Sequence, residues 1–333
     1  MVTEQRFTQE HILEQRMPQI EELWQTGVFS SFNTPDQLEI HYALITKDEL
    51  TDWVVVAPGR SESYLKYKEV AFDLINNGYN VAIIDHRGQG LSQRELDDRH
   101  KGYVKDFSDY TSDLEAFIAD IVKPQCNGQI FMLAHSMGAN IAARFLAQTS
   151  LNINAAVLLA PMIAIDAGVF PNWLGRLVVS ISYFFDKLIN KQSAYFYGRG
   201  QYKEKVFKGS DLMQSKIRFN FFRDLYNDDK RIQLGGVTFA WLNAAIKSED
   251  FIMQNLTTLT TPVAVMQAGA DNVVCNNIQD KFCQQLNTLH PNSCPNGTTT
   301  MIKGAKHELL FEKDEYRNQA LTKTLDWFNQ HRA

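Results

Sequence analysis

Short apolar runs alternate along this chain with longer stretches in which apolar residues recur every three or four positions. Short runs between turn-forming residues predict buried strands, and the longer spacing predicts amphipathic helices. The predicted strands span residues 38–45, 53–57, 81–85, 130–134, 155–160, 263–268 and 299–302. The predicted helices span residues 64–76, 110–122, 138–148, 277–289 and 316–330. This alternation is typical of an α/β fold, in which a mostly parallel sheet has helices on both faces.

The alternation is interrupted once, between Pro161 and Pro262, where about a hundred residues have the pattern of helices and loops. An insertion between two strands explains this best, because the strand pattern resumes after it. The first thirty residues are polar and have a helical pattern of their own. We therefore expect a helical arm at residues 1–30, a core at 31–161 and 261–333, and a helical cap at 162–260.

The stretch IFMLAHSMGA, residues 130–139, predicts a strand, a sharp turn that carries Ser136, and a helix. A small-x-Ser-x-Gly pattern is common by chance, and it has meaning only where a strand precedes it and a helix follows. Both conditions are met here. A serine held in such a turn is exposed and constrained, as a nucleophilic serine must be. Ala134 stands where this turn usually has glycine, and alanine is the next smallest residue.

Two later predicted strands end in residues that can assist Ser136. The strand at 263–268 is followed by Asp271, and the strand at 299–302 is followed by His307. The order serine, aspartate, histidine is that of an α/β-hydrolase triad, in which histidine is the base and aspartate orients it. The alternatives are that Asp271 caps the helix starting near Asn277, and that His307 is an ordinary polar loop residue.

The loop after the strand at 53–57 offers an oxyanion site. Gly59 permits a close backbone approach, so the backbone N–H groups of Arg60 and Met137 can converge on one substrate oxygen, with Gly138 supporting the turn. The alternative is an ordinary strand-to-helix turn capped by a serine of that loop, and both can hold at once. The segment DHRGQGLS, residues 85–92, follows the next strand and is interpreted as a supporting turn.

Composition excludes several other classes. The chain has 333 residues, 44% of them hydrophobic, and a net charge of −5, so a general nucleic-acid-binding role has no electrostatic support. The four cysteines show neither CxxC spacing nor a histidine-rich neighbourhood, which argues against a zinc site. We expect no metal and no cofactor.

The start of the chain is polar and charged and lacks the apolar segment of a secretory signal. The longest apolar runs are far shorter than a bilayer span. These features predict a cytoplasmic protein, with peripheral contact at the inner face of the cell membrane as a further expectation.

Residues 162–224 differ from the rest in carrying ten Lys or Arg against five Asp or Glu, together with thirteen aromatic residues. Within them, residues 177–191 place their apolar positions on one helical face. One interpretation is a lid helix that packs on its own domain. The other is an interfacial surface whose aromatics enter lipid headgroups while its cations meet an anionic membrane.

The segments PGRSES, DHRGQGLS, AHSMGA, AGAD and GAKHELLFEKDEYR resemble those of the serine α/β hydrolases. Within that family they are similar to the lysophospholipase and monoacylglycerol-lipase branch, most closely to bacterial inner-membrane lysophospholipases. The resemblance covers the chain from about residue 30 and implies an α/β-hydrolase fold with a helical cap. It implies Ser136 as nucleophile, His307 as base and Asp271 as orienter. Pro58 departs from the histidine of many relatives.

The resemblance further implies a serine hydrolase that cleaves the carboxylic ester of single-acyl-chain lipids through an acyl-enzyme. Lysophospholipids are the first expectation. The alternatives are a monoacylglycerol lipase, a general carboxylesterase, a lipid transacylase in which another alcohol replaces water, and a non-catalytic binding protein on the same fold.

Overall fold

A computed structural model describes residues 6–164 and 172–332, and these form one eight-stranded sheet. The strands are β1 (Val28–Asn33), β2 (Glu39–Ile45), β3 (Trp53–Ala57), β4 (Asn80–Ile84), β5 (Ile130–His135), β6 (Ala155–Leu159), β7 (Val263–Ala268) and β8 (Thr300–Ile302). Their order is β1-β2-β4-β3-β5-β6-β7-β8. The pairs β1–β2 and β2–β4 are antiparallel and every other pair is parallel. The carboxyl ends of β3, β5, β6, β7 and β8 therefore meet along one edge.

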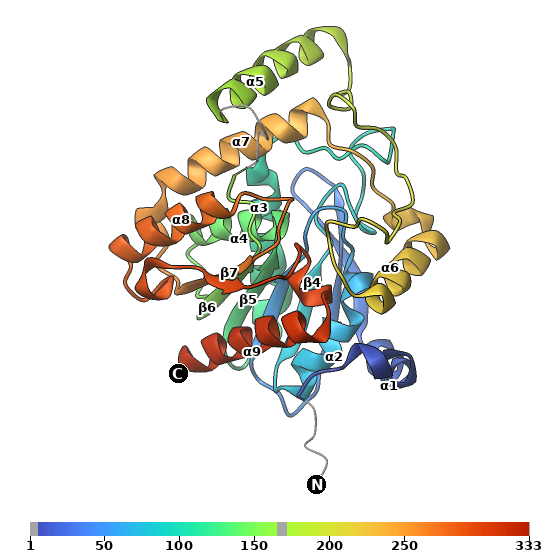
Figure 1. Cartoon of the computed structure of the whole chain (residues 1–333), viewed down its shortest axis with the longest axis vertical. Helices are drawn as coiled ribbons and strands as arrows, with labels where there is room; N and C mark the ends of the chain where they lie inside the picture. The colour runs from blue at the N-terminus through green and yellow to red at the C-terminus, as the bar shows by residue number, and fades with distance from the viewer. Residues whose placement is uncertain (1–5, 165–171, 333) are drawn as a thin grey trace.

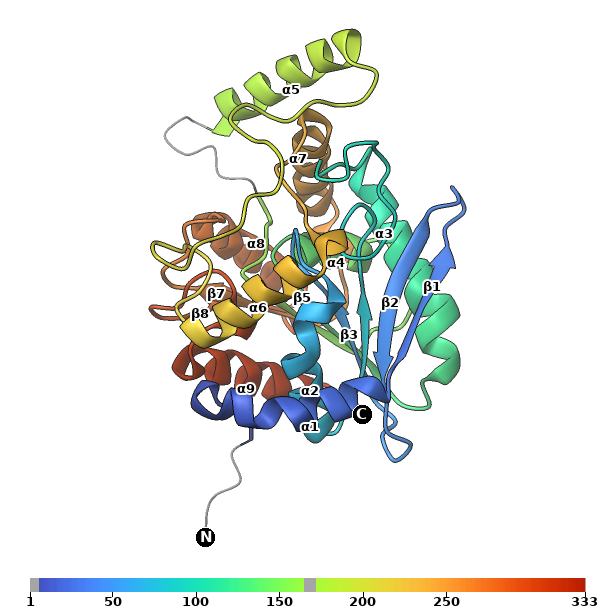
Figure 2. The same cartoon turned by 90° about the vertical axis from the view of Figure 1, so that its right-hand side faces the viewer.

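Helices cover both faces of this sheet. They are α1 (Leu13–Gln25), α2 (Lys68–Asn76), α3 (Phe107–Ala116), α4 (Met137–Leu146), α5 (Asn172–Ile189), α6 (Lys216–Asp228), α7 (Phe239–Gln254), α8 (Asn276–Leu289) and α9 (Asp314–Gln330). In both views α1, α2 and α9 lie together on one side, and α3, α4 and α7 lie together on the other (Figures 1 and 2). The predicted fold class, a mostly parallel sheet between helices, is confirmed.

The sheet has one strand more than the sequence predicts. β1 reads VFSSFN, and the two serines interrupt its apolar pattern because much of this edge strand is exposed. It is held by antiparallel pairing with β2 along its whole length. The other strands lie within one or two residues of the predicted runs.

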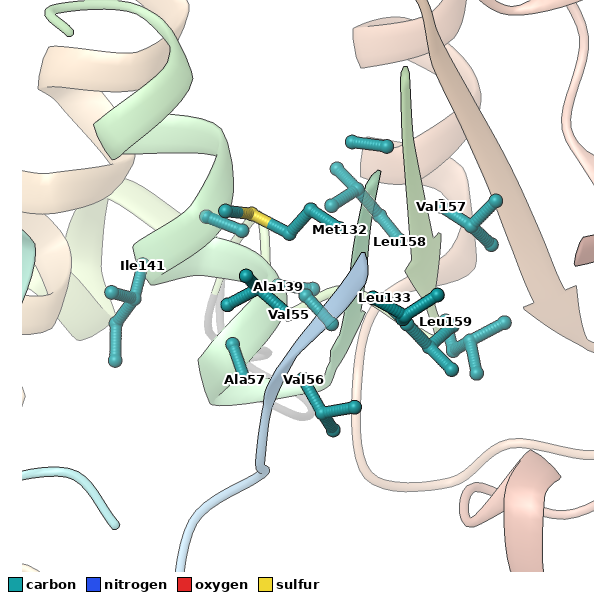
Figure 3. Packing of buried hydrophobic residues seen from close by; sticks show 14 of the residues in the cluster. Val55, Val56, Ala57, Met132, Leu133, Ala139, Ile141, Val157, Leu158 and Leu159 are labelled. Atoms are coloured by element: carbon teal, nitrogen blue, oxygen red, sulfur yellow. The ribbon is translucent and has the colours of Figure 1, made fainter. Parts of the chain in front are cut away.

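Part of the core lies where β3, β5 and β6 pack against α4. Figure 3 shows Val55 and Ala57 of β3 and Met132 of β5 on the side of the sheet that faces Ala139 of the helix, whereas Val56 points to the other side. All five residues are buried. This packing fixes β5 against α4 and so fixes the turn between them, which carries Ser136.

In the part of the inserted region that the structure describes, the helices α5, α6 and α7 have different surroundings. α7 packs on α3 and α4, with Trp241 against Phe107 and the Ser248 hydroxyl donating to Asn140. α6 lies near α1 and α2, whereas α5 lies outermost, beyond α7, in both views (Figures 1 and 2). The division into arm, core and cap remains a prediction. Within the described ranges, no helix is both long and apolar enough to cross a membrane.

Candidate active site

Ser136, His307 and Asp271 form a continuous chain of hydrogen bonds. His307 Nε2 lies 2.9 Å from Ser136 Oγ, and His307 Nδ1 lies 2.8 Å from Asp271 Oδ2. The three residues follow β5, β8 and β7, whose carboxyl ends lie on the same edge of the sheet. The structure thus brings together the three residues that the sequence singled out, in an arrangement that can move a proton from the serine to the histidine.

Ser136 stands on a strained turn between β5 and α4. Its backbone has φ 53° and ψ −114°, a left-handed conformation that a serine adopts only when its surroundings impose it. The surroundings are tight, because a Cβ added at Gly138 would lie 2.1 Å from the Ala57 carbonyl oxygen. Ala134 is fully buried opposite Ala57, so alanine fits where this turn usually has glycine.

Asp271 uses its two carboxylate oxygens for different purposes. Oδ2 faces His307, and Oδ1 accepts from the backbone N–H of Val273 at 2.7 Å. The N-cap residue of α8 is Cys275 and not Asp271, so the capping alternative is wrong. The Asp271 side chain is fully buried. This arrangement fixes the carboxylate against the imidazole and favours the tautomer with its proton on Nδ1.

The predicted oxyanion donors lie on the two segments that flank Ser136. Among the hydrogen bonds of the described residues, no acceptor takes the backbone N–H of Arg60 or Met137. The loop and the helix start are in close contact, since a Cβ at Gly138 would lie 2.4 Å from the Pro58 carbonyl oxygen and one at Gly59 would lie 2.7 Å from His135 Nδ1. Both N–H groups remain available for a substrate oxygen, and their role remains a prediction.

The chain matches known proteins over most of its length. Residues 48–314 match the family model Hydrolase_4, described as serine aminopeptidase, S33. The chain is 34% identical over 317 residues to lysophospholipase L2 of Escherichia coli strain K12, which covers 95% of this chain and 92% of that protein. It is 25% identical to monoglyceride lipase of Rattus norvegicus, covering 84% of this chain and 83% of that protein.

The chain belongs to the Hydrolase_4 family. A solved structure of a soluble variant of monoglyceride lipase from Saccharomyces cerevisiae, in complex with a substrate analog, has TM-score 0.66 at 18% identity and covers 92% of this chain and 96% of that chain. This likeness shows the α/β-hydrolase fold. Membership confirms the predicted resemblance and the predicted class of enzyme, a carboxylic ester hydrolase that acts on lipid esters.

This Hydrolase_4 member has a supporting residue that the sequence analysis missed. Glu62 Oε2 accepts from the Gly59 backbone N–H at 2.5 Å and from the Tyr67 hydroxyl at 2.6 Å, and it lies 3.3 Å from His135 Nδ1. The other nitrogen of His135 lies 3.2 Å from the carbonyl oxygen of His307. One buried carboxylate therefore links the oxyanion loop, the residue before the nucleophile and the base.

Lys66 forms ion pairs with this carboxylate and with a second one. Its ammonium lies 2.7 Å from Glu62 Oε1 and 2.7 Å from Glu308 Oε2, and all three side chains are buried. Burial alone would raise the pKa of Glu62, but Lys66 and His135 hold that pKa well below its usual range. Burial would lower the pKa of His135, and the Glu62 carboxylate raises it instead. The only sequence signal for the cluster is the spacing of four between Glu62 and Lys66, because Glu308 lies far along the chain.

Gln89 holds the oxyanion loop from the side of the DHRGQGLS segment. Its side-chain amide donates to the carbonyl oxygens of Gly59 at 2.8 Å and Glu62 at 3.1 Å, and its carbonyl accepts from the Ser61 N–H. Asp85 accepts from the backbone N–H of Tyr64 at 2.5 Å, and burial raises the pKa of Asp85 to about 7. This segment supports the loop, as the sequence predicts.

The inserted region also forms hydrogen bonds with the oxyanion loop. The Tyr226 hydroxyl of α6 donates to the Ser61 carbonyl oxygen at 2.5 Å, and the Arg60 guanidinium donates to the carbonyl oxygen of Gly235. Among the residues that the structure describes, no group of three or more His, Cys, Asp or Glu side chains is placed to hold a metal ion.

Proposed function

We propose that this protein hydrolyses the carboxylic ester of lipids with a single acyl chain, lysophospholipids first, with Ser136 as nucleophile. The observation that carries the proposal is the hydrogen-bond chain from Ser136 through His307 to Asp271. The likeness to lysophospholipase L2 over nearly the whole chain supports the choice of substrate.

The mechanism follows from the positions of the three side chains. His307 Nε2 accepts the proton of Ser136 as Oγ attacks the ester carbonyl, and Asp271 stabilises the imidazolium that forms. The backbone N–H groups of Arg60 and Met137 stabilise the oxyanion. The imidazolium then protonates the leaving alcohol. Water, activated by the same histidine, releases the fatty acid from Ser136.

Replacing the nucleophile tests the mechanism. Ser136→Ala should abolish hydrolysis of lysophosphatidylcholine, because no other group can form the acyl-enzyme, and should leave the melting temperature close to that of the wild type. Turnover and thermal unfolding are measured on the same preparation. Unchanged hydrolysis by the folded variant would rule out the mechanism.

Monoacylglycerol hydrolysis is the second candidate. It needs the same triad, and the likeness to monoglyceride lipase of Rattus norvegicus favours it. Turnover of lysophosphatidylcholine, lysophosphatidylethanolamine, a monoacylglycerol and a short p-nitrophenyl ester should be compared side by side. Preference for the lysophospholipids supports the proposal, whereas activity on the short ester alone indicates a general esterase. A glycerol acceptor added to the assay detects transacylation.

Peripheral membrane contact through α5 is part of the same proposal. Eight large apolar side chains of this helix are exposed, namely Trp173, Leu177, Val178, Ile181, Phe184, Phe185, Leu188 and Ile189. The opposite side of the helix packs on α7, through buried Val179 and the ion pairs of Arg176 with Glu249 and Asp250. An exposed apolar helix face beside Lys187 and Lys191 suits the headgroup region of an anionic bilayer.

Vesicle binding tests this part. The protein should cosediment with vesicles containing phosphatidylglycerol at low salt, and Phe184→Ser with Leu188→Ser should weaken binding at least tenfold. Thr288→Ser on α8 is a control for an exposed position elsewhere. Absence of binding at low salt would remove the membrane from the proposal and leave the hydrolase mechanism intact.

A further inference from the structure

A pocket lies between the oxyanion loop and the inserted region. Its cavity volume is about 60 Å³, and it is open to solvent at its mouth. Arg60 and Ser61 of the loop and Glu308, the neighbour of His307, line its inner end. Lys205, Phe222 and Tyr226 of the inserted region line the outer part. A lipid whose ester carbonyl lies at the Arg60 N–H therefore has this space within a few bonds of its scissile group.

Arg60 brings an uncompensated charge into this pocket. Its guanidinium donates only to neutral acceptors, the carbonyl of Gly235 and the Ser61 hydroxyl at 2.9 Å, and its Nε is buried without a partner. In the described part of the chain no carboxylate pairs with it. Burial lowers the pKa of Arg60 to about 10, so the group stays charged at neutral pH. A desolvated cation without a counterion is costly unless a ligand supplies the negative charge.

Lys205 is a second cation on the same wall. Among the described residues it has neither an ion pair nor a hydrogen bond through its ammonium. The residue as a whole is exposed, but its charged end is desolvated, and this lowers its pKa against the opposing effect of the Glu308 carboxylate. Glu308, the carboxylate that faces it, is already held by Lys66 at 2.7 Å. Among the described residues, neither of these two cations of the pocket has an ion pair with a carboxylate.

We infer that this pocket is the headgroup subsite for the phosphate of a lysophospholipid, with Arg60 and Lys205 as its two cationic contacts. The inference rests on the proposed function and deepens it, because it names what separates a lysophospholipid from a monoacylglycerol. Both lipids carry the same ester and release the same fatty acid, and only the first carries a phosphate. Charge-assisted hydrogen bonds to phosphate give the discrimination.

The test compares two substrates with the same acyl chain. Wild type, Lys205→Gln and Lys205→Glu are assayed on lysophosphatidylcholine and on the matching monoacylglycerol, both below their critical micelle concentrations. The quantity compared is the kcat/KM for the lysophospholipid divided by the kcat/KM for the monoacylglycerol. Lys205→Gln should lower this ratio about tenfold, because it raises the KM for the lysophospholipid. Lys205→Glu should lower the ratio further. Lys203→Gln, an exposed lysine of the same segment outside the pocket, should leave the ratio unchanged.

The outcomes separate the two proposals. The headgroup subsite would be overturned if the Lys205 variants changed kcat/KM equally on both substrates or changed neither. An equal change on both substrates would indicate a fatty-acid site. A wild type that hydrolyses neither lipid would overturn the proposed function itself. Glycerophosphocholine should inhibit monoacylglycerol hydrolysis in the wild type and less in Lys205→Gln. Equal inhibition by inorganic phosphate would indicate a site for the free ion and would overturn the assignment to a lipid headgroup.

Discussion

The helices α5 and α6 come from the same inserted region and are bound to the protein in opposite ways. α6 is fixed by Arg218, whose side chain is 0% exposed and lies 2.8 Å from both Glu69 Oε1 and Asp314 Oδ1. The outward residues of α5 have no such partners, and its Leu188 and Ile189 are 67% and 77% exposed.

This difference fits the two tasks proposed for these helices. A helix that positions the oxyanion loop through Tyr226 has to be rigid, so buried ion pairs and caps hold it. A helix that meets lipid needs free apolar surface and few internal bonds. We therefore expect damage to α6 to appear as lost stability and lost turnover, and damage to α5 to appear only at a membrane.

The largest effect is expected at Arg218. Arg218→Met removes the buried cation and leaves the carboxylates of Glu69 and Asp314 without it, which should lower the free energy of unfolding by about 3 to 5 kcal/mol. Chemical unfolding at neutral pH measures this. Lys216→Met, at an exposed position of the same helix, is the matched control. Equal losses in both variants would mean that the ion pairs do not anchor α6.

Low pH should lower the stability of the protein through His86, a core residue under the oxyanion loop. His86 is fully buried, and burial lowers its pKa to about 4, so it is neutral in the folded protein at pH 5. In the unfolded chain the His86 imidazole has its usual, higher pKa and binds the proton more tightly. The free energy of unfolding therefore decreases as the pH falls from about 6.5 towards 4. The loss from this group reaches on the order of 3 kcal/mol.

His86→Leu isolates this contribution. The difference in unfolding free energy between pH 7 and pH 4 should be smaller in the variant than in the wild type. Asp85, whose pKa burial raises to about 7, acts with the opposite sign in both proteins and cancels in the comparison. An unchanged pH dependence would show that His86 is not the titrating group.

A smaller effect is expected at the contact between α6 and the oxyanion loop. Tyr226→Phe removes the hydrogen bond to the Ser61 carbonyl and should lower kcat roughly fivefold, since one such bond contributes about 1 kcal/mol. Tyr183→Phe on α5, a tyrosine whose hydroxyl has no hydrogen-bond partner among the described residues, should not change kcat. An equal loss of kcat in Tyr226→Phe and Tyr183→Phe would contradict the view that α6, and not α5, supports turnover.

The smallest effect is expected on the outer face of α5. Leu188→Ser should change the free energy of unfolding by less than about 0.5 kcal/mol, because the side chain is already in water. Phe219→Ser on α6, a buried position, should cost about 3 kcal/mol or more. A destabilised Leu188→Ser protein would mean that α5 is packed in solution after all.

The triad could be predicted because each of its members follows a predicted strand. Parallel strands bring their carboxyl ends to one edge, so Ser136, Asp271 and His307 meet although the chain separates them widely. β1 could not be predicted, because an exposed edge strand with two serines lacks a clear apolar alternation.

The polar clusters around the site could not be predicted for a different reason. Lys66 binds Glu62 and also Glu308, which lies 242 residues further along the chain. Arg218 binds Glu69, which lies 149 residues before it. Charged residues are frequent, and a sequence pattern cannot tell which pairs become buried together. The exposure of α5 was one of two open interpretations, because an amphipathic pattern fixes the apolar face but not what covers it.

The junction around Arg218 has a consequence for synthesis. The guanidinium also donates to the Thr8 carbonyl at 3.3 Å, and the Glu10 N–H donates to Asp314 at 3.0 Å, so three distant parts of the chain meet there. These contacts cannot form during synthesis on the ribosome until α9 has emerged. His307 emerges only shortly before α9. A nascent chain therefore carries Ser136 for most of its synthesis without the histidine that hydrogen-bonds to it in the folded protein.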